Sequence, residues 1–224
     1  MGVSEEIQSQ LVYKDLFSIG GLGIPASVVA TWGVMIFLVV FSIIMTRNMK
    51  LVPTSKKQLL IEKFIEMLYN GLYNLIGEKG KRYIPYLLTV MLYLGVANML
   101  GMFGINPPTK DLNTTAGLAL MSIVLVQYAG IHEKGVGGWL KAFAHPIAMI
   151  TPMNIMELAI KPLSLCMRLF GNVLGAFIIM ELIKYVCPLV APMVLSLYFD
   201  IFDGCLQAYV FVFLTSLYIQ EAIE

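Results

Sequence analysis

One arginine stands in the middle of a long apolar stretch in the second half of the chain. This residue, Arg168, lies within residues 153–186, where hydrophobic side chains dominate. A guanidinium stays protonated at any working pH. A charge at the centre of a lipid bilayer costs ~2.5–3.5 kcal/mol even on lenient insertion scales, so such a residue usually marks an ion path. Arg168 is therefore the first candidate functional residue, as a permanent positive charge that attracts carboxylates and repels mobile cations.

A second group of polar residues lies in the next apolar stretch, residues 189–219. Its members are spaced by four, three and four positions, namely Ser196, Asp200, Asp203 and Gln207. This spacing places all four side chains on one face of a helix. Carboxylates are as costly in lipid as arginine, so this face is a second candidate part of an ion path.

The stretch around Arg168 has a polar face of its own. At 100° per residue, a stripe within ~40° of Arg168 comprises Glu157, Lys161, Ser164, Asn172 and Gly175. Glu181 and Lys184 fall on the opposite side and are expected to face a different neighbour. For Glu157, Lys161 and Lys184 two interpretations stay open: a role in the ion path, or a structural role as paired or snorkelling charges.

The composition shows what kind of elements must position these residues. Of the 224 residues, 58% are hydrophobic and 13% are charged, about half the charged fraction of a soluble domain (~25%). This balance predicts an integral membrane protein. The net charge of +1 argues against a nucleic-acid binder, which needs clustered Lys and Arg. No GxxxxGK[ST] loop occurs, so we do not expect this chain to bind a nucleotide.

The pattern predicts an all-α membrane protein with about five transmembrane helices. Crossing the hydrocarbon core takes ~20 apolar residues, and such stretches occur at residues 24–45, 83–105, 114–131, 153–186 and 189–219. The last two are longer than a perpendicular crossing needs, so we expect strong tilt. Residues 24–224 then form one membrane domain behind an external N-terminal segment, residues 1–23. The short apolar run 143–152, bounded by Pro146 and Pro152, is expected to be re-entrant or to lie on the surface.

Residues 54–77 are predicted to form an amphipathic helix at the membrane surface, with Thr54 or Ser55 as its cap. Its apolar residues recur at helical spacing, and lysines and glutamates fill the other positions. Basic residues follow the first span directly, so the positive-inside rule places this segment in the cytoplasm. We therefore expect the N-terminus outside and the C-terminus in the cytoplasm. The absence of a transit peptide favours the cell membrane of a bacterium.

Three separate motifs resemble those of subunit a of F-type ATP synthases. They are Lys161-Pro-Leu-Ser-Leu-Cys-Met-Arg168-Leu-Phe-Gly-Asn172, Leu206-Gln207-Ala-Tyr-Val-Phe-Val-Phe-Leu-Thr215, and the loop Pro107-Pro-Thr-Lys-Asp-Leu-Asn113 that follows Asn98-Met-Leu-Gly101. They occur in the family's order, and the resemblance covers roughly residues 25 to 220. It implies a stator subunit of the Fo motor, with no catalytic site and no cofactor in this chain. Its partners would be the c-ring, the b subunits of the peripheral stalk and the lipid bilayer.

The resemblance also assigns roles to single residues. Arg168 corresponds to the essential stator charge that faces the c-ring, while Asn172, Gln207 and Asp200 match other positions of the ion path. One departure is Phe177, nine residues after the arginine, where some members carry a glutamate. Glu181, one turn later, could replace that glutamate.

Two offset aqueous half-channels would deliver H+ or Na+ to and from the ring. The outer one is expected to be lined by Asp200, Asp203 and Glu181, with Asn113 and Asp111 at its mouth. No fixed metal site is expected, although Na+ could bind transiently near Asp200 and Asp203. A secondary ion-coupled transporter is the alternative, but such folds usually contain internal repeats, and neither the Arg168 motif nor the Gln207 motif recurs in the first half of this sequence. A purely structural anchor subunit is a third interpretation.

Overall fold

The computed structural model describes residues 15–19, 22–47, 49–50, 55–144, 151–186 and 191–223. This part of the chain is almost entirely helical and contains five helical segments that are long and apolar enough to cross a membrane. Large hydrophobic side chains are exposed along all of them, as expected where lipid is the solvent. The structure thus confirms the predicted all-α membrane fold.

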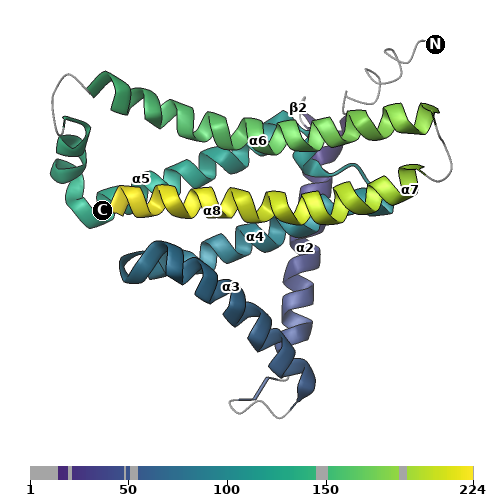
Figure 1. Cartoon of the computed structure of the whole chain (residues 1–224), viewed down its shortest axis with the longest axis horizontal. Helices are drawn as coiled ribbons and strands as arrows, with labels where there is room; N and C mark the ends of the chain where they lie inside the picture. Colours follow the sequence, from purple (N-terminus) through teal and green to yellow (C-terminus); the bar gives the residue numbers. More distant parts are fainter. Residues whose placement is uncertain are drawn as a thin grey trace.

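The first span, α2 (Ala26–Thr46), stands apart from the other helices over most of its length (Figure 1). Its hydrophobic side chains are largely exposed, and Ser27 and Val34 are its buried residues. A short antiparallel hairpin precedes it, formed by β1 (Asp15–Ile19) and β2 (Leu22–Pro25). The hydrophobic pattern of the sequence did not predict this hairpin. The other residues of the segment 1–23 lie outside the described part of the chain.

The predicted amphipathic helix is α3 (Lys56–Gly80), with Ser55 at its N-cap. Its first half exposes large apolar side chains, whereas Leu72 and Ile76 in its second half are buried where α3 packs against α8 and α4. Gly77 has a φ of 73°, a conformation that favours glycine, and it kinks the last turn. The short 3-10 turn η1 (Lys81–Tyr83) then leads into the second span.

The second and third spans are joined by a compact loop. The second comprises α4 (Ile84–Met99) and the turn η2 (Leu100–Phe103), and the third is α5 (Leu112–Ala144), which is kinked at Gly135. Between them lies the turn η3 (Pro108–Lys110). Asp111 accepts hydrogen bonds from the Asn113 backbone at 3.0 Å and from Ser27 Oγ at 2.5 Å. It therefore caps α5 and ties the start of α2 to this loop.

The last two spans form a long antiparallel pair. The first is α6 (Thr151–Val186), and the second consists of α7 (Ala191–Ser196), the π-helical η5 (Leu197–Asp203) and α8 (Gly204–Ile223). They lie side by side and crosswise to α2 (Figure 1). The central helix is α8, because it packs against α3, α4, α5 and α6. Most of the predicted re-entrant segment, residues 145–150, lies outside the described residues.

Candidate functional site

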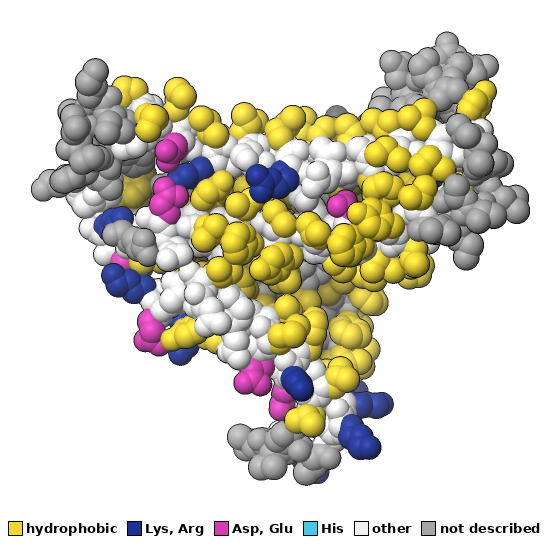
Figure 2. Space-filling model, viewed as in Figure 1, with side chains coloured by type: hydrophobic (Ala, Val, Ile, Leu, Met, Phe, Trp, Pro, Cys, Tyr) yellow, Lys and Arg dark blue, Asp and Glu magenta, His cyan; other side chains and the backbone are white. Residues whose placement is uncertain are grey.

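Arg168 lies on the exposed side of α6 and faces away from the helix bundle. Within the described part of the chain it forms neither a hydrogen bond nor a salt bridge, and its neighbours Leu165 and Leu169 carry the packing against the core. Figure 2 shows basic side chains that interrupt an otherwise largely hydrophobic surface along α6. A permanently charged side chain on a lipid-facing surface is costly. Arg168 is thus an exposed charge that a group from outside the described part of the chain could contact.

A cavity of about 610 Å³ lies at one end of the α6–α8 pair, and we call it the outer cavity. It brings together five predicted site residues, from α6 and from the segment α7–η5–α8: Glu181, Ser196, Asp200, Asp203 and Gln207. The four-three-four spacing thus gives a shared face, as predicted, even though residues 197–203 are π-helical. Within the described residues Asp200 and Asp203 have no hydrogen-bond or salt-bridge partner. Two carboxylates without fixed partners can attract and pass on a mobile cation.

The π-helical turn is held in place by close packing against α4. Asn98, which is buried, donates from Nδ2 to the backbone oxygen of Gly204 at 3.1 Å. At Gly204 an added Cβ would lie 2.9 Å from Asn98 Cβ, and at Gly101 it would collide with the Asp200 carboxylate. Gly204 therefore has no room for a larger side chain beside Asn98, whereas a side chain at Gly101 would displace the flexible Asp200 carboxylate. In the sequence Asn98 and Gly101 stand out only as parts of a motif, so their role in positioning Asp200 was missed.

Asn172 and Gln207 connect α6 to α8 beside the outer cavity. Asn172 Nδ2 donates to Gln207 Oε1 at 2.6 Å. Gln207 is 2% exposed, and its own Nε2 finds no acceptor among the described residues. The structure therefore brings these two predicted residues into direct contact, one helical turn beyond Arg168.

Lys110 was missed as a site residue by sequence reasoning, although it lines the outer cavity. It is 4% exposed, and its Nζ lies 3.3 Å from the centroid of the Phe177 ring. Burial lowers the pKa of the Lys110 ammonium to about 8, with Glu181 opposing that shift and Lys184 adding to it. Phe177, the residue that departs from the family's glutamate, therefore carries a cation on its face.

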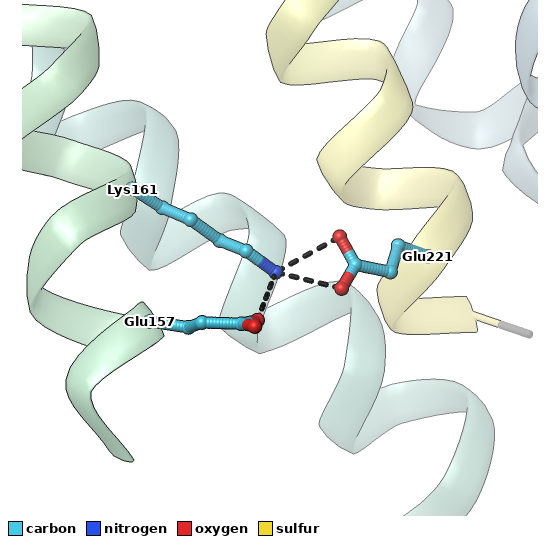
Figure 3. A network of polar contacts seen from close by, with 3 residues as sticks. All are labelled: Glu157, Lys161 and Glu221. Atoms are coloured by element: carbon cyan, nitrogen blue, oxygen red, sulfur yellow. Dashed lines mark hydrogen bonds and ion pairs between the residues drawn. The ribbon is translucent and has the colours of Figure 1, made fainter. Parts of the chain in front are cut away.

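A smaller cavity of about 290 Å³, the inner cavity, lies toward the other end of the same helix pair and is lined by Glu157, Lys161, Tyr218 and Glu221. Lys161 Nζ lies 2.9 Å from both carboxylate oxygens of Glu221 and 3.5 Å from Glu157 Oε2 (Figure 3). This cluster joins the first part of α6 to the end of α8. The contacts fit the structural interpretation that the sequence left open for Glu157 and Lys161.

Three predicted residues are not brought into either cavity, namely Ser164, Asn113 and Asp111. Ser164 is half-buried on α6, and Asn113 is exposed at the start of α5. The Asp111 carboxylate is engaged by Ser27 and by the Asn113 backbone. Lys184 lines the outer cavity, where its Nζ pairs with Glu181 Oε1 at 2.7 Å. Thus Glu181 and Lys184 face away from Arg168, as the helical wheel predicted.

Charges of both signs line the outer cavity. Three carboxylates and two lysines line it, which gives a net charge of −1. In the described part of the chain no group of three or more His, Cys, Asp or Glu side chains could hold a metal ion. Arg168 lies on α6 between the two cavities. The nearest lining residue of the outer cavity along this helix is Val173, and that of the inner cavity is Lys161. At 1.5 Å per residue they lie ~8 Å and ~10 Å from Arg168 along the helix axis.

Comparison with known proteins gives a consistent answer. The family described as ATP synthase A chain matches residues 28–220. The chain is similar to ATP synthase subunit a of Moorella thermoacetica, with 35% identity over 94% of this chain and 96% of the relative. It is also similar to the sodium ion specific ATP synthase subunit a of Propionigenium modestum, with 34% identity over 91% of this chain and 75% of the relative. A third relative, ATP synthase subunit a 1 of Pelobacter propionicus, is 33% identical over 88% of this chain and 87% of its own length.

The family resemblance noted in the three motifs is thereby confirmed over most of the chain. The matched region contains α6, α7, η5 and most of α8, and with them Arg168 and most of the residues that line the two cavities. The chain belongs to the ATP synthase A chain family.

Proposed function

We propose that this chain is the stator subunit of the Fo motor in a bacterial cell membrane. In this role it passes H+ or Na+ through two offset half-channels to and from the carboxylates of a c-ring. The observation that carries the proposal is the position of Arg168, exposed on α6 and flanked along that helix by two cavities with ionisable linings. The outer cavity would serve as one half-channel and the inner cavity as the start of the other.

Arg168 would force ion release from the ring. A rotor carboxylate that comes within 4 Å of the guanidinium gains roughly 4 kcal/mol at an effective dielectric of 20, which favours its ionised form. The bound cation then leaves into a half-channel. The same positive charge repels a cation that would cross directly between the two cavities, so ions pass only as the ring turns. Lysine would serve less well, because a buried ammonium can lose its proton.

The outer cavity would hand ions to the ring by way of Asp200 and Asp203. Neither carboxylate is bound to another described residue, so each can exchange a cation without breaking a salt bridge. Glu181 would add a further negative charge to the cavity lining. The salt bridge between its Oε1 and Lys184 Nζ, at 2.7 Å, would partly neutralise that charge. The Asn172–Gln207 bond would fix the distance between the helix of the arginine and the helix of the carboxylates.

The membrane arrangement follows from the same proposal. The N-terminus would lie outside and the C-terminus in the cytoplasm, so that the outer cavity opens to the exterior. Subunit b and the c-ring would cover parts of the exposed apolar surface, and lipid would cover the rest. Catalysis of ATP synthesis would take place on other subunits. One relative of this chain is described as sodium ion specific, so both H+ and Na+ should be tested as the transported ion.

The decisive experiment replaces Arg168 within the assembled complex. Arg168→Ala should abolish ion-driven ATP synthesis while the complex still assembles, because an exposed side chain without partners among the described residues contributes little to folding. Purified membranes should be assayed for synthesis driven by an imposed H+ gradient and, separately, by a Na+ gradient. Leu163→Ala, a change at another exposed position of α6, is the matched control and should retain synthesis. Normal coupled synthesis in Arg168→Ala would refute the proposal.

A further inference from the structure

A buried lysine shares the outer cavity with the carboxylates that would attract ions. Lys110 is 4% exposed, whereas the side chain of Lys184, the other lysine of the cavity lining, is 51% exposed. Burying an ammonium is costly, so its presence needs a reason beyond filling space. Solvent surrounds about half of the Lys184 side chain and screens its charge. Lys110 therefore has the stronger influence on the field inside the cavity.

The loop that carries Lys110 is anchored to the helices of the site. Thr109 Oγ1 donates to Asn98 Oδ1 at 2.8 Å, and Asn98 Nδ2 donates to the Gly204 oxygen at 3.1 Å. Gly204 directly follows Asp203, so this chain of bonds connects the lysine's backbone to the carboxylate segment. At the far end of the Lys110 side chain, the ammonium lies 3.3 Å from the centroid of the Phe177 ring. An aromatic face orients a cation without neutralising it.

Charged groups reach the cavity from each side of Lys110. Glu181 and Lys184 come from α6, and Asp200 and Asp203 from η5. Asp111, on the lysine's own loop, turns its carboxylate to Ser27 and to the Asn113 backbone instead. The cavity lining carries a net charge of −1 with Lys110 protonated and −2 with Lys110 neutral. Deprotonation of this one lysine therefore doubles the net negative charge of the cavity lining.

We propose that Lys110 is a specificity-determining residue that sets the cation affinity of the outer cavity. The positive charge of its ammonium partly cancels the negative potential of Asp200, Asp203 and Glu181, and so weakens their attraction for an incoming cation. This keeps the cavity from holding its cation too tightly to pass it on. The inference rests on the proposed function, since it assumes that ions enter through this cavity.

The test uses the intact complex with Lys110→Met and Lys110→Arg, in membranes from which the catalytic head has been stripped. Passive conduction of H+ is driven by a K+ diffusion potential, and that of Na+ is followed with a radioactive tracer. In Lys110→Met the half-saturating Na+ concentration should fall about threefold, or the pH of half-maximal H+ conduction should rise by ~0.5 unit. Lys110→Arg keeps the charge and should match the wild type at pH 7.

The pH profile separates this role from mere packing. The Lys110 pKa of about 8 means that the wild-type ammonium is charged below pH 8 and loses its proton above it. Wild type should therefore converge on Lys110→Met at high pH, while Lys110→Arg, which stays charged, should not. A residue that only packed against Phe177 would leave this profile unchanged. Should Lys110→Met fail to assemble, equal profiles of wild type and Lys110→Arg would still overturn the inference.

Lys184→Met is the matched control, because it removes the other lysine of the same cavity from a more solvated position. Its effect should be smaller than that of Lys110→Met. Equal effects of the two variants, or no effect of Lys110→Met at any pH, would overturn the inference. These outcomes differ from failure of the proposed function, which would appear as normal coupled synthesis in Arg168→Ala.

Discussion

Asn172 and Gln207 join the two helices of the site through one short hydrogen bond, in which Asn172 Nδ2 donates to Gln207 Oε1 at 2.6 Å. Asn172 follows Arg168 by four residues and Gln207 follows Asp203 by four. The bond thus connects the turn after the exposed arginine to the turn after a cavity carboxylate. It holds Arg168, on the exposed side of α6, at a fixed separation from the carboxylates that line the outer cavity.

A double-mutant cycle should measure this connection. Asn172→Leu and Gln207→Leu each leave one amide without its partner, so each should destabilise the chain by ~1–3 kcal/mol. The double variant should lose less than the sum of the two, with a coupling of ~0.5–1.5 kcal/mol. Denaturant titration of the purified chain in detergent provides the free energies of unfolding. Strictly additive losses would mean that the bond does not form in the membrane protein.

The close approach of Gly101 to Asp200 leads to a second prediction. A methyl group at Gly101 would occupy the place of the Asp200 carboxylate, and that flexible side chain can swing aside at little cost. Gly101→Ala should therefore leave assembly unchanged but slow ion conduction, as Asp200→Asn would. The measurement is passive conduction through membranes stripped of the catalytic head. Gly95→Ala on α4 is the control, because nothing lies within 4 Å of its added Cβ, and conduction in it should equal that of the wild type.

Helical periodicity made several features of the site predictable from the sequence. Ser196, Asp200, Asp203 and Gln207 share one cavity because their spacing keeps them on one face, and the π-helical turn does not undo this. Glu181 and Arg168 face different sides because their wheel positions differ by ~140°. A helical wheel considers one helix at a time. It therefore predicts which side chains share a face, but not which neighbouring helix packs against that face.

The misses arise where the chain leaves regular structure. Lys110 lies in a loop, and its place over Phe177 depends on the anchoring of that loop by Asn98. Asn113, which was expected at the cavity mouth, is not part of the cavity lining. It is exposed at the start of α5, where its backbone helps Asp111 cap the helix. Loop side chains only two or three positions apart can point in different directions, and no periodicity reveals which one enters a cavity.

The cluster of Lys161 with Glu157 and Glu221 gives the last prediction. It joins α6 to the final turns of α8, and the Glu221 side chain is 58% exposed, so its net contribution to global stability should be at most ~1 kcal/mol. Its effect should instead be local. Lys161→Met should speed hydrogen exchange in the last turns of α8, because the far end of that helix loses its tie to α6.

Lys184→Met is the matched control for this cluster. It also breaks an exposed salt bridge on α6, but the partner, Glu181, lies on the same helix, so exchange in α8 should not change. High salt should reproduce the effect of Lys161→Met in the wild type, because ions screen partly exposed charge pairs. Unchanged exchange at the end of α8 in Lys161→Met, under low-salt conditions, would show that packing against α3 and α5 holds that end without help from the cluster.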